Sequence, residues 1–251
     1  MKNYFLSLFF VLLTVLSLGQ AQKGKSFYLI NLDEKSLNTY DKHLLDSLLP
    51  VYHTTKNDTN KLKVLKYFAS ALSDEKIWVP YNNLLYTITF GKTDTMSRTY
   101  NADALNNKGY EYQYLRNEVD SAIGFYNKAL ELNTSAGYAP GMGIVLNNLA
   151  YIYQQQGNLE KCIDLYNQAD MLFTKSNYSE GLISININLG DIYFKNEDYT
   201  KAEESFKKAL AFSNKTKSNF LLGNVYSQLG AIYRHKKKHS QSFQYYLQSG
   251  G

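Results

Sequence analysis

The chain has a single cysteine, Cys162, among its 251 residues, so no disulfide can form within it. A disulfide framework is therefore excluded, and the fold must be held by packing. Proline occurs only three times, whereas tyrosine occurs 23 times. Few helix breakers and many long side chains favour helices over a turn-rich β architecture. Apolar residues make up 44% of the chain, which excludes an intrinsically disordered protein.

A strong excess of charge is also lacking. The formal net charge is +5, and removal of Lys2 with a cleaved leader would leave +4. Lysines are scattered among acidic residues, and the one dense basic run, Lys236 to Lys238, falls at a predicted turn. Nucleic-acid binding needs a basic stripe on one face, so we expect no nucleic-acid partner.

Long apolar runs are missing except at the amino terminus. Lys2 is followed by an apolar stretch from Tyr4 to Leu18, and Gly19 and Ala21 then supply small residues before Gln22. This layout predicts a signal peptide over residues 1–21, cleaved after Ala21, and a periplasmic or extracellular protein. An uncleaved membrane anchor is the alternative, although the run is shorter than the roughly 20 residues of a span. No later segment is apolar enough to insert, so we expect no membrane insertion of the mature chain.

A small–aromatic–small pattern at positions i, i+4 and i+7 recurs four times with a spacing of 40 residues. The copies are Ala122–Tyr126–Ala129, Cys162–Tyr166–Ala169, Ala202–Phe206–Ala209 and Ser242–Tyr246–Ser249. These three positions share one face of a helix. The small residues let a neighbouring helix approach closely, and the aromatic ring fills the groove beside them.

A second pattern precedes each copy. It consists of Leu, then Gly or Ala, then Tyr three residues later, as in Leu189, Gly190 and Tyr193, and it also repeats every 40 residues. Gly109 and Tyr112 supply the match in the first repeat, where the connection to Ala122 is one residue longer. Polar turns separate the two patterns, so each repeat is predicted to be a pair of antiparallel helices.

These residues resemble the tetratricopeptide repeat family, whose pattern is met at Leu189, Gly190, Tyr193, Ala202, Phe206 and Ala209. The resemblance implies an all-α fold, a right-handed superhelical solenoid of antiparallel helix pairs. The period of about 40 exceeds the usual 34 of the family, which requires longer helices or linkers. We expect four repeats within residues 97–251, at about 97–135, 140–176, 180–216 and 220–251.

Residues 22–96 are predicted to form a degenerate helical segment that caps the amino-terminal end of the solenoid. We expect Asp58 to cap its second helix and Trp78 to open its third. Positions 40 before Ala122 and Tyr126 hold Asn82 and Tyr86, which suggests an eroded repeat. Gly91 to Met96 are expected to be a linker.

Catalytic or cofactor chemistry has no support in the sequence. His235 and His239 have a metal-like spacing but no third ligand, and His239 takes a position that is apolar or aromatic in the other repeats, so we expect it to pack. Cys162 takes the small-residue position and is expected to be a buried spacer. Phosphate loops, paired carboxylates and nucleophile motifs are not found, so we predict a non-enzymatic protein with neither metal nor cofactor.

Polar residues that recur on the first helices of the repeats are the candidate binding residues. They are Asn107, Asn147, Asn148, Tyr151, Gln154, Asn188, Asp191, Lys195, Gln228 and Arg234. In a tetratricopeptide superhelix the first helices line the concave groove, where amides could bind the backbone of an extended peptide. The same amides could instead cap or cross-link neighbouring helices.

Two functions remain open. The chain is either an exported scaffold that binds a peptide or protein, or the sensory part of a longer signalling protein such as a histidine kinase or transcriptional regulator. Phe243, Tyr246 and Leu247 are expected at an open end of the solenoid. We therefore expect either further residues after Gly251 or self-association through this end.

Overall fold

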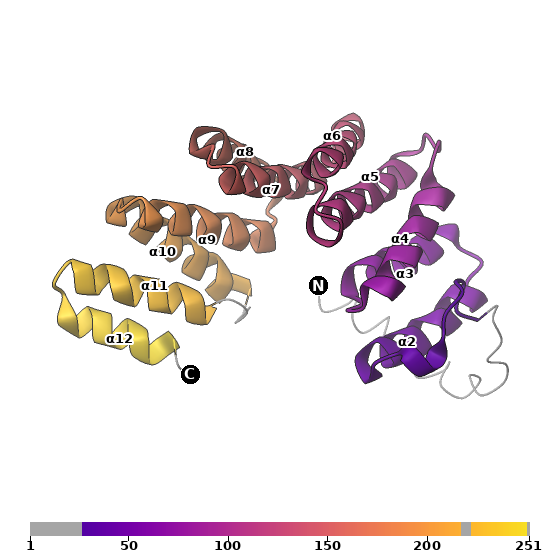
Figure 1. Ribbon diagram of the computed structural model, residues 1–251, viewed down its shortest axis with the longest axis horizontal. Coiled ribbons are helices and arrows are strands. Elements are labelled where there is room, and N and C mark those ends of the chain that lie inside the picture. Colours follow the sequence, from indigo (N-terminus) through magenta and orange to yellow (C-terminus); the bar gives the residue numbers. More distant parts are fainter. Residues whose placement is uncertain (1–26, 217–221, 250–251) are drawn as a thin grey trace. The chain divides into compact units, whose positions relative to one another are not determined.

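The computed structural model describes residues 27–216 and 222–249, and its chain divides into two compact units, Met1–Leu132 and Asn133–Gly251. Every regular element within the described residues is helical, as predicted (Figure 1). None of the helices in these ranges is both long and apolar enough to span a membrane. The predicted leader lies outside the described residues, as do Gly250 and Gly251.

The first regular element among the described residues is a short 3-10 turn, Glu34–Ser36, and the first unit continues through helices α2 to α6. These are α2 (Thr39–Thr54), α3 (Asp58–Ala71), α4 (Glu75–Thr89), α5 (Thr95–Tyr110), the π-helical turn η2 (Glu111–Leu115) and α6 (Val119–Ser135), whose last residues belong to the second unit. The second unit continues with α7 (Ala139–Gln155), α8 (Leu159–Ser176), α9 (Ser179–Lys195), α10 (Tyr199–Thr216), α11 (Leu222–His235) and α12 (His239–Ser249).

Three expected boundaries in the first unit are wrong, because a capping side chain starts each helix earlier. Asn57 caps α3, since its side chain accepts hydrogen bonds from the backbone N–H groups of the first turn, and Asp58 is already helical. Asp74 starts α4, so Trp78 and Pro80 lie inside that helix. Asp94 caps α5, which leaves a shorter linker than the expected Gly91–Met96.

Helix α2 is attached to the rest of the first unit through a buried carboxylate. Asp41 accepts hydrogen bonds at 2.8–3.1 Å from the backbone N–H groups of Ser73 and Asp74 and from the Ser73 hydroxyl, in the turn between α3 and α4. Burial alone would raise the pKa of Asp41, but these hydrogen bonds outweigh it and lower the pKa. Leu45, Phe68 and Tyr81 come from α2, α3 and α4, are fully buried and belong to one hydrophobic core.

The extra residue between Gly109 and Ala122 is absorbed by the π-helical turn that follows α5. There the Arg116 amide donates to the Glu111 carbonyl, five residues back, where an α-helix would span four. Glu111 is buried, and its carboxylate pairs with the Arg116 guanidinium at 2.6 Å, which closes the turn. A one-residue insertion therefore widens the end of the helix and leaves the register of α6 unchanged.

The second unit is built from helix pairs whose packing follows the small–aromatic–small pattern. Tyr166 and Phe206 are fully buried, as are the small residues before and after them, Cys162 included. A Cβ atom added at Gly190 would come within 2.6 Å of the Phe206 ring, so the glycine is what allows the ring to lie against α9. Gly230 faces Tyr246 in the same way. The predicted roles of Cys162 and Phe206 in the core are thus confirmed.

The 40-residue period is repeated in the backbone of the turns. Positive φ values of 55° to 76° occur at Asn117, Gly157, Glu197 and Lys237, each 40 residues after the one before. A residue in this left-handed conformation ends the first helix and directs the chain into the second. Lys236–Lys238 lie in the last of these turns, as predicted.

The expected packing role of His239 is wrong, because this side chain is exposed. It is the first residue of α12, and the aromatic contact is made instead by His235, whose ring is tilted against the Tyr199 ring with centroids 4.1 Å apart. The two histidines therefore have different surroundings in spite of their helical spacing. Among residues 27–216 and 222–249, no three His, Cys, Asp or Glu side chains are grouped so that they could hold a metal ion.

Candidate first-helix binding surface

Nine of the ten candidate binding residues lie in the second unit, on the first helix of each pair. They are Asn147, Asn148, Tyr151 and Gln154 on α7, Asn188, Asp191 and Lys195 on α9, and Gln228 and Arg234 on α11. We call these nine residues the first-helix surface. The tenth, Asn107, lies on α5 in the first unit.

The amides of the first-helix surface link two neighbouring helices. The Asn188 side chain on α9 donates to the Asn147 side-chain oxygen on α7 at 3.1 Å, and Asn147 in turn donates to Asn148 at 3.3 Å. All three residues are half-buried. Part of their hydrogen-bonding capacity is therefore used to hold α7 beside α9, in line with the cross-linking interpretation.

Asn107 makes a comparable link within the first unit. Its amide donates at 3.0 Å to the side-chain oxygen of Asn82, and Asn82 donates at 3.0 Å to the Ala104 carbonyl. Asn82 is fully buried at the position that a small residue takes in the other repeats. A polar residue is tolerated at that position because both ends of its amide are hydrogen-bonded to α5.

Asp191 differs from the amides in having an unused acceptor. Its side-chain atom Oδ1 is buried and accepts no hydrogen bond from the described residues. Burial raises the pKa of this carboxyl, and the positive charge of Lys195, one turn along α9, offsets part of the rise. A donor from a bound partner would complete the hydrogen bonding of Asp191.

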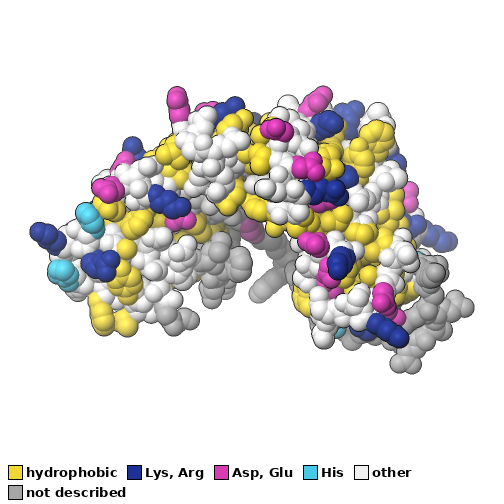
Figure 2. All heavy atoms as spheres, in the orientation of Figure 1, with side chains coloured by type: hydrophobic (Ala, Val, Ile, Leu, Met, Phe, Trp, Pro, Cys, Tyr) yellow, Lys and Arg dark blue, Asp and Glu magenta, His cyan; other side chains and the backbone are white. Residues whose placement is uncertain are grey.

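The carboxyl-terminal ends of the first helices present the accessible part of this surface. Lys195 and Arg234 are exposed, and Gln154, Tyr151 and Gln228 are half-buried. Neither Lys195 nor Arg234 forms an ion pair within the described ranges, so both can interact with a partner. On the face of the molecule shown in Figure 2, basic and acidic side chains are interspersed over the surface.

A charged cluster between α10 and α11 was missed by reasoning from the sequence. The Glu203 carboxylate accepts hydrogen bonds from the Tyr233 hydroxyl at 2.5 Å and from Lys207 and Lys236 at 2.6 Å each. The i, i+4 spacing of Glu203 and Lys207 predicts their pairing, but nothing in the spacing brings in residues 30 and 33 positions further on. This cluster joins one repeat to the next.

Two segments of the second unit match models of the tetratricopeptide repeat family. The matches cover residues 145–173 and 181–249, which include most of α7 to α12. These segments are therefore tetratricopeptide repeats, as their residue pattern predicts. No curated protein matches the sequence of this chain.

Several solved structures have a fold similar to that of this chain. BtubC (BKLC) from P. vanneervenii is similar with a TM-score of 0.60 and 17% identity, over 84% of this chain and 85% of that one. Aspartyl phosphate phosphatase F from Bacillus subtilis is similar with a TM-score of 0.57 and 15% identity, over 84% of this chain and 63% of that one. A putative kinesin light chain from Podospora anserina with TPR-like repeats is similar with a TM-score of 0.52 and 14% identity, over 78% of this chain and 95% of that one. At these identities the likeness establishes the fold alone, a helical solenoid of the tetratricopeptide type.

Proposed function

We propose that this chain is an exported interaction module that binds a peptide or protein on the first-helix surface, without catalysis of its own. The observation that carries the proposal is the position of Gln154, Lys195 and Arg234. Lys195 and Arg234 are exposed and Gln154 is half-buried, and the three lie at the ends of three successive first helices. Repeats of this kind generally act as scaffolds, and an extended partner that crosses several of them gains contacts from each.

Capture by immobilised protein tests the proposal. The purified chain is exposed to an extract of the cell envelope, and bound proteins are quantified by mass spectrometry for three forms of the bait. One is the wild type, one carries Gln154→Ala, Lys195→Ala and Arg234→Ala, and the matched control carries Gln168→Ala, Lys175→Ala and Lys208→Ala on second helices. A partner retained by the control and lost by the first-helix variant supports the proposal. Equal capture by both variants would exclude this surface as the binding site.

Export is proposed from residues 1–21 alone. The short apolar run after Lys2 and the small residues before Gln22 have the layout of a cleaved leader. Mass spectrometry of the exported protein should give Gln22 as the first residue. An intact species beginning at Met1 in the membrane fraction would contradict cleavage and favour an anchor.

The alternative function is the sensory part of a longer signal-transduction protein. It is supported by the order of segments, in which a leader and a degenerate helical segment precede 40-residue repeats. A coding region for a membrane helix and a kinase or regulator module downstream of Gly251 would establish it. Binding to the first-helix surface would then be the input to that module.

Self-association through α12 is a further part of the proposal. Phe243 and Leu247 are 64% and 62% exposed, although the positions 40 residues earlier, Glu203 and Lys207, belong to the cluster that joins α10 to the next repeat. Large apolar side chains at an inter-repeat position favour contact with another surface. Sedimentation over a concentration range should show association that Phe243→Ser with Leu247→Ser abolishes, and a monomer at all concentrations would exclude it.

A further inference from the structure

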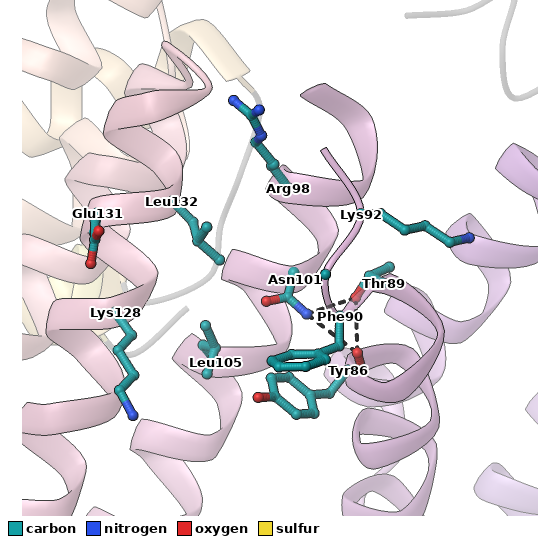
Figure 3. Close-up of a pocket in the computed structure, with 11 residues that line it drawn as sticks. Tyr86, Thr89, Phe90, Lys92, Arg98, Asn101, Leu105, Lys128, Glu131 and Leu132 are labelled. Atoms are coloured by element: carbon teal, nitrogen blue, oxygen red, sulfur yellow. Dashed lines mark hydrogen bonds between the residues drawn. The ribbon is translucent and has the colours of Figure 1, made fainter. Parts of the chain in front are cut away.

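A cavity of about 380 Å³ lies in the first unit and shares no residue with the first-helix surface (Figure 3). Three elements line it: the end of α4 with the turn after it, the middle of α5, and the part of α6 that belongs to this unit. The volume falls in the range of small-ligand sites and exceeds what one water molecule needs.

The middle of the cavity is apolar and aromatic. Tyr86 and Phe90 form a tilted ring pair with centroids 5.4 Å apart, and Leu105 and Leu132 point into the space beside it (Figure 3). Phe90 is 66% exposed, which is unusual for a phenylalanine and leaves its ring at the mouth of the cavity. An apolar group of a ligand would cover this ring.

The α4–α5 wall of the cavity is fixed before any ligand binds. The Asn101 side chain on α5 donates to the Thr89 hydroxyl at 3.0 Å and to the Tyr86 carbonyl at 3.3 Å, both on α4. Asn101 and Thr89 are buried, so these bonds hold the two helices at a set separation next to the ring pair. A preformed wall reduces the cost of ordering the site on binding.

The charged lining of the cavity is mainly positive. Arg98 and Lys128 lie at its two ends in Figure 3, Lys92 is a third cation, and Glu131 is the single acid among the lining residues. Lys128 lies 5.9 Å from the Phe125 ring, and neither Arg98 nor Lys128 forms an ion pair with any residue in the described ranges. Unpaired cations beside an apolar cavity attract an anion that carries an apolar group.

We propose that this cavity binds a carboxylate attached to an aromatic or branched aliphatic group. The apolar group lies against Phe90, Leu105 and Leu132, and the carboxylate meets Arg98 or Lys128. Either a free organic acid or an acidic peptide with a large apolar side chain has this chemistry. The site is separate from the first-helix surface, so its test can fail while the proposed function holds.

Titration followed by two-dimensional ¹H–¹⁵N NMR of the full chain tests this site with two probes, 3-phenylpropionate and the tripeptide acetyl-Glu-Phe-Glu-amide. Saturable shifts at the amides of Gly91, Asn101 and Leu105 are expected, with dissociation constants on the order of 0.1–1 mM for ligands of this size. The neutral analogue 3-phenylpropionamide should bind at least about fivefold more weakly, because it lacks the charge. The tighter of the two acids identifies the source of the ligand, and either result supports the site.

Variants decide whether the cavity is responsible. Arg98→Gln with Lys128→Gln should weaken binding about tenfold, and Phe90→Ala should weaken it by a similar factor. Lys63 is an exposed residue on α3 outside the cavity, so Lys63→Gln should leave the affinity unchanged. Arg98→Lys with Lys128→Arg keeps both charges and should retain binding, which separates loss of charge from loss of fold. The proposal would be overturned by any one of three results: equal affinity for the neutral analogue, unchanged affinity of the Arg98→Gln and Lys128→Gln double variant, or absence of saturable shifts.

Discussion

At the scale of single residues, the second unit depends on pairs in which a large ring meets a residue with little or no side chain. Phe206 against Gly190 is the clearest case, because any Cβ at position 190 would overlap the ring. The recurring glycine and aromatic positions in the sequence therefore correspond to residues in contact. For this reason, single substitutions at these positions should have large effects on the free energy of unfolding.

The first prediction concerns Phe206, which is fully buried. Phe206→Ala should lower the free energy of unfolding by about 3–5 kcal/mol, since it removes the ring and leaves a cavity. Urea denaturation of the full chain measures the change. Phe243→Ala is the matched control: its ring is 64% exposed, and a loss below about 0.5 kcal/mol is expected. A loss below about 1 kcal/mol for Phe206→Ala would show that the ring is not a core anchor.

The second prediction concerns the charge at Glu203. Burial alone would raise its pKa, but hydrogen bonds from two lysines and a tyrosine outweigh it and lower the pKa to about 2. A carboxyl with a lowered pKa in the folded state stabilises the protein above its unfolded pKa of about 4.5. The contribution, about 1–3 kcal/mol, should therefore be lost as the pH falls from about 5 to 2.

Glu203→Gln should remove that part of the pH dependence, and Glu204→Gln is the control. Glu204 is the adjacent residue, with a more exposed side chain that pairs only with Lys208 among the described residues. Thermal unfolding between pH 7 and pH 2.5 should give a flatter profile for Glu203→Gln than for Glu204→Gln. Identical profiles would mean that the cluster does not stabilise the folded state.

At the scale of elements, the turns repeat as faithfully as the helices do. The left-handed residue between the helices of a pair is Gly157 in one repeat but Glu197 in the next. A side chain with a Cβ in this conformation costs roughly 1 kcal/mol, which glycine avoids. The turn geometry is therefore kept even where the sequence does not supply the favoured residue.

Glu197→Gly should raise the free energy of unfolding by about 0.5–1 kcal/mol, because it relieves the strain at φ 61°. Glu180→Gly, in the first turn of α9, should lower it by a similar amount, because there glycine only adds conformational entropy to the unfolded chain. Denaturant unfolding of both variants gives opposite signs if the turn is as described. Destabilisation by Glu197→Gly would contradict it.

The boundaries of elements show how far the sequence can be used for prediction. The helix pairs after residue 97 follow from the repeated pattern, since each position is supported by its equivalents in other repeats. In the residues before 97, the helices are capped by Asn57, Asp74 and Asp94. Each has neighbours in the sequence that could also cap a helix, and only the backbone geometry shows which residue is the cap. The π-helical turn likewise appears in the sequence only as one additional residue.

At the scale of the whole molecule, the two helical units present different surfaces. The second unit carries the first-helix surface, whose residues lie on α7, α9 and α11, the first helices that the 40-residue period predicts. The cavity of the first unit was not predicted, because its lining residues come from three elements and only the packing of those elements brings them together. Likewise, the spacing of Asn147 and Asn188 indicates a shared surface, but their hydrogen bond to each other depends on how α7 packs against α9.

The most direct test of the central claim is site-specific photo-cross-linking from the first-helix surface. A benzophenone amino acid replaces Lys195 on α9 in one protein and Lys208 on α10 in the other. Both residues are exposed lysines of the same unit, on the first and second helix of one pair. Irradiation with the partner isolated by capture should give a cross-linked product from position 195 and little from position 208. Equal products from both positions, or a product from position 208 alone, would contradict binding on the first helices.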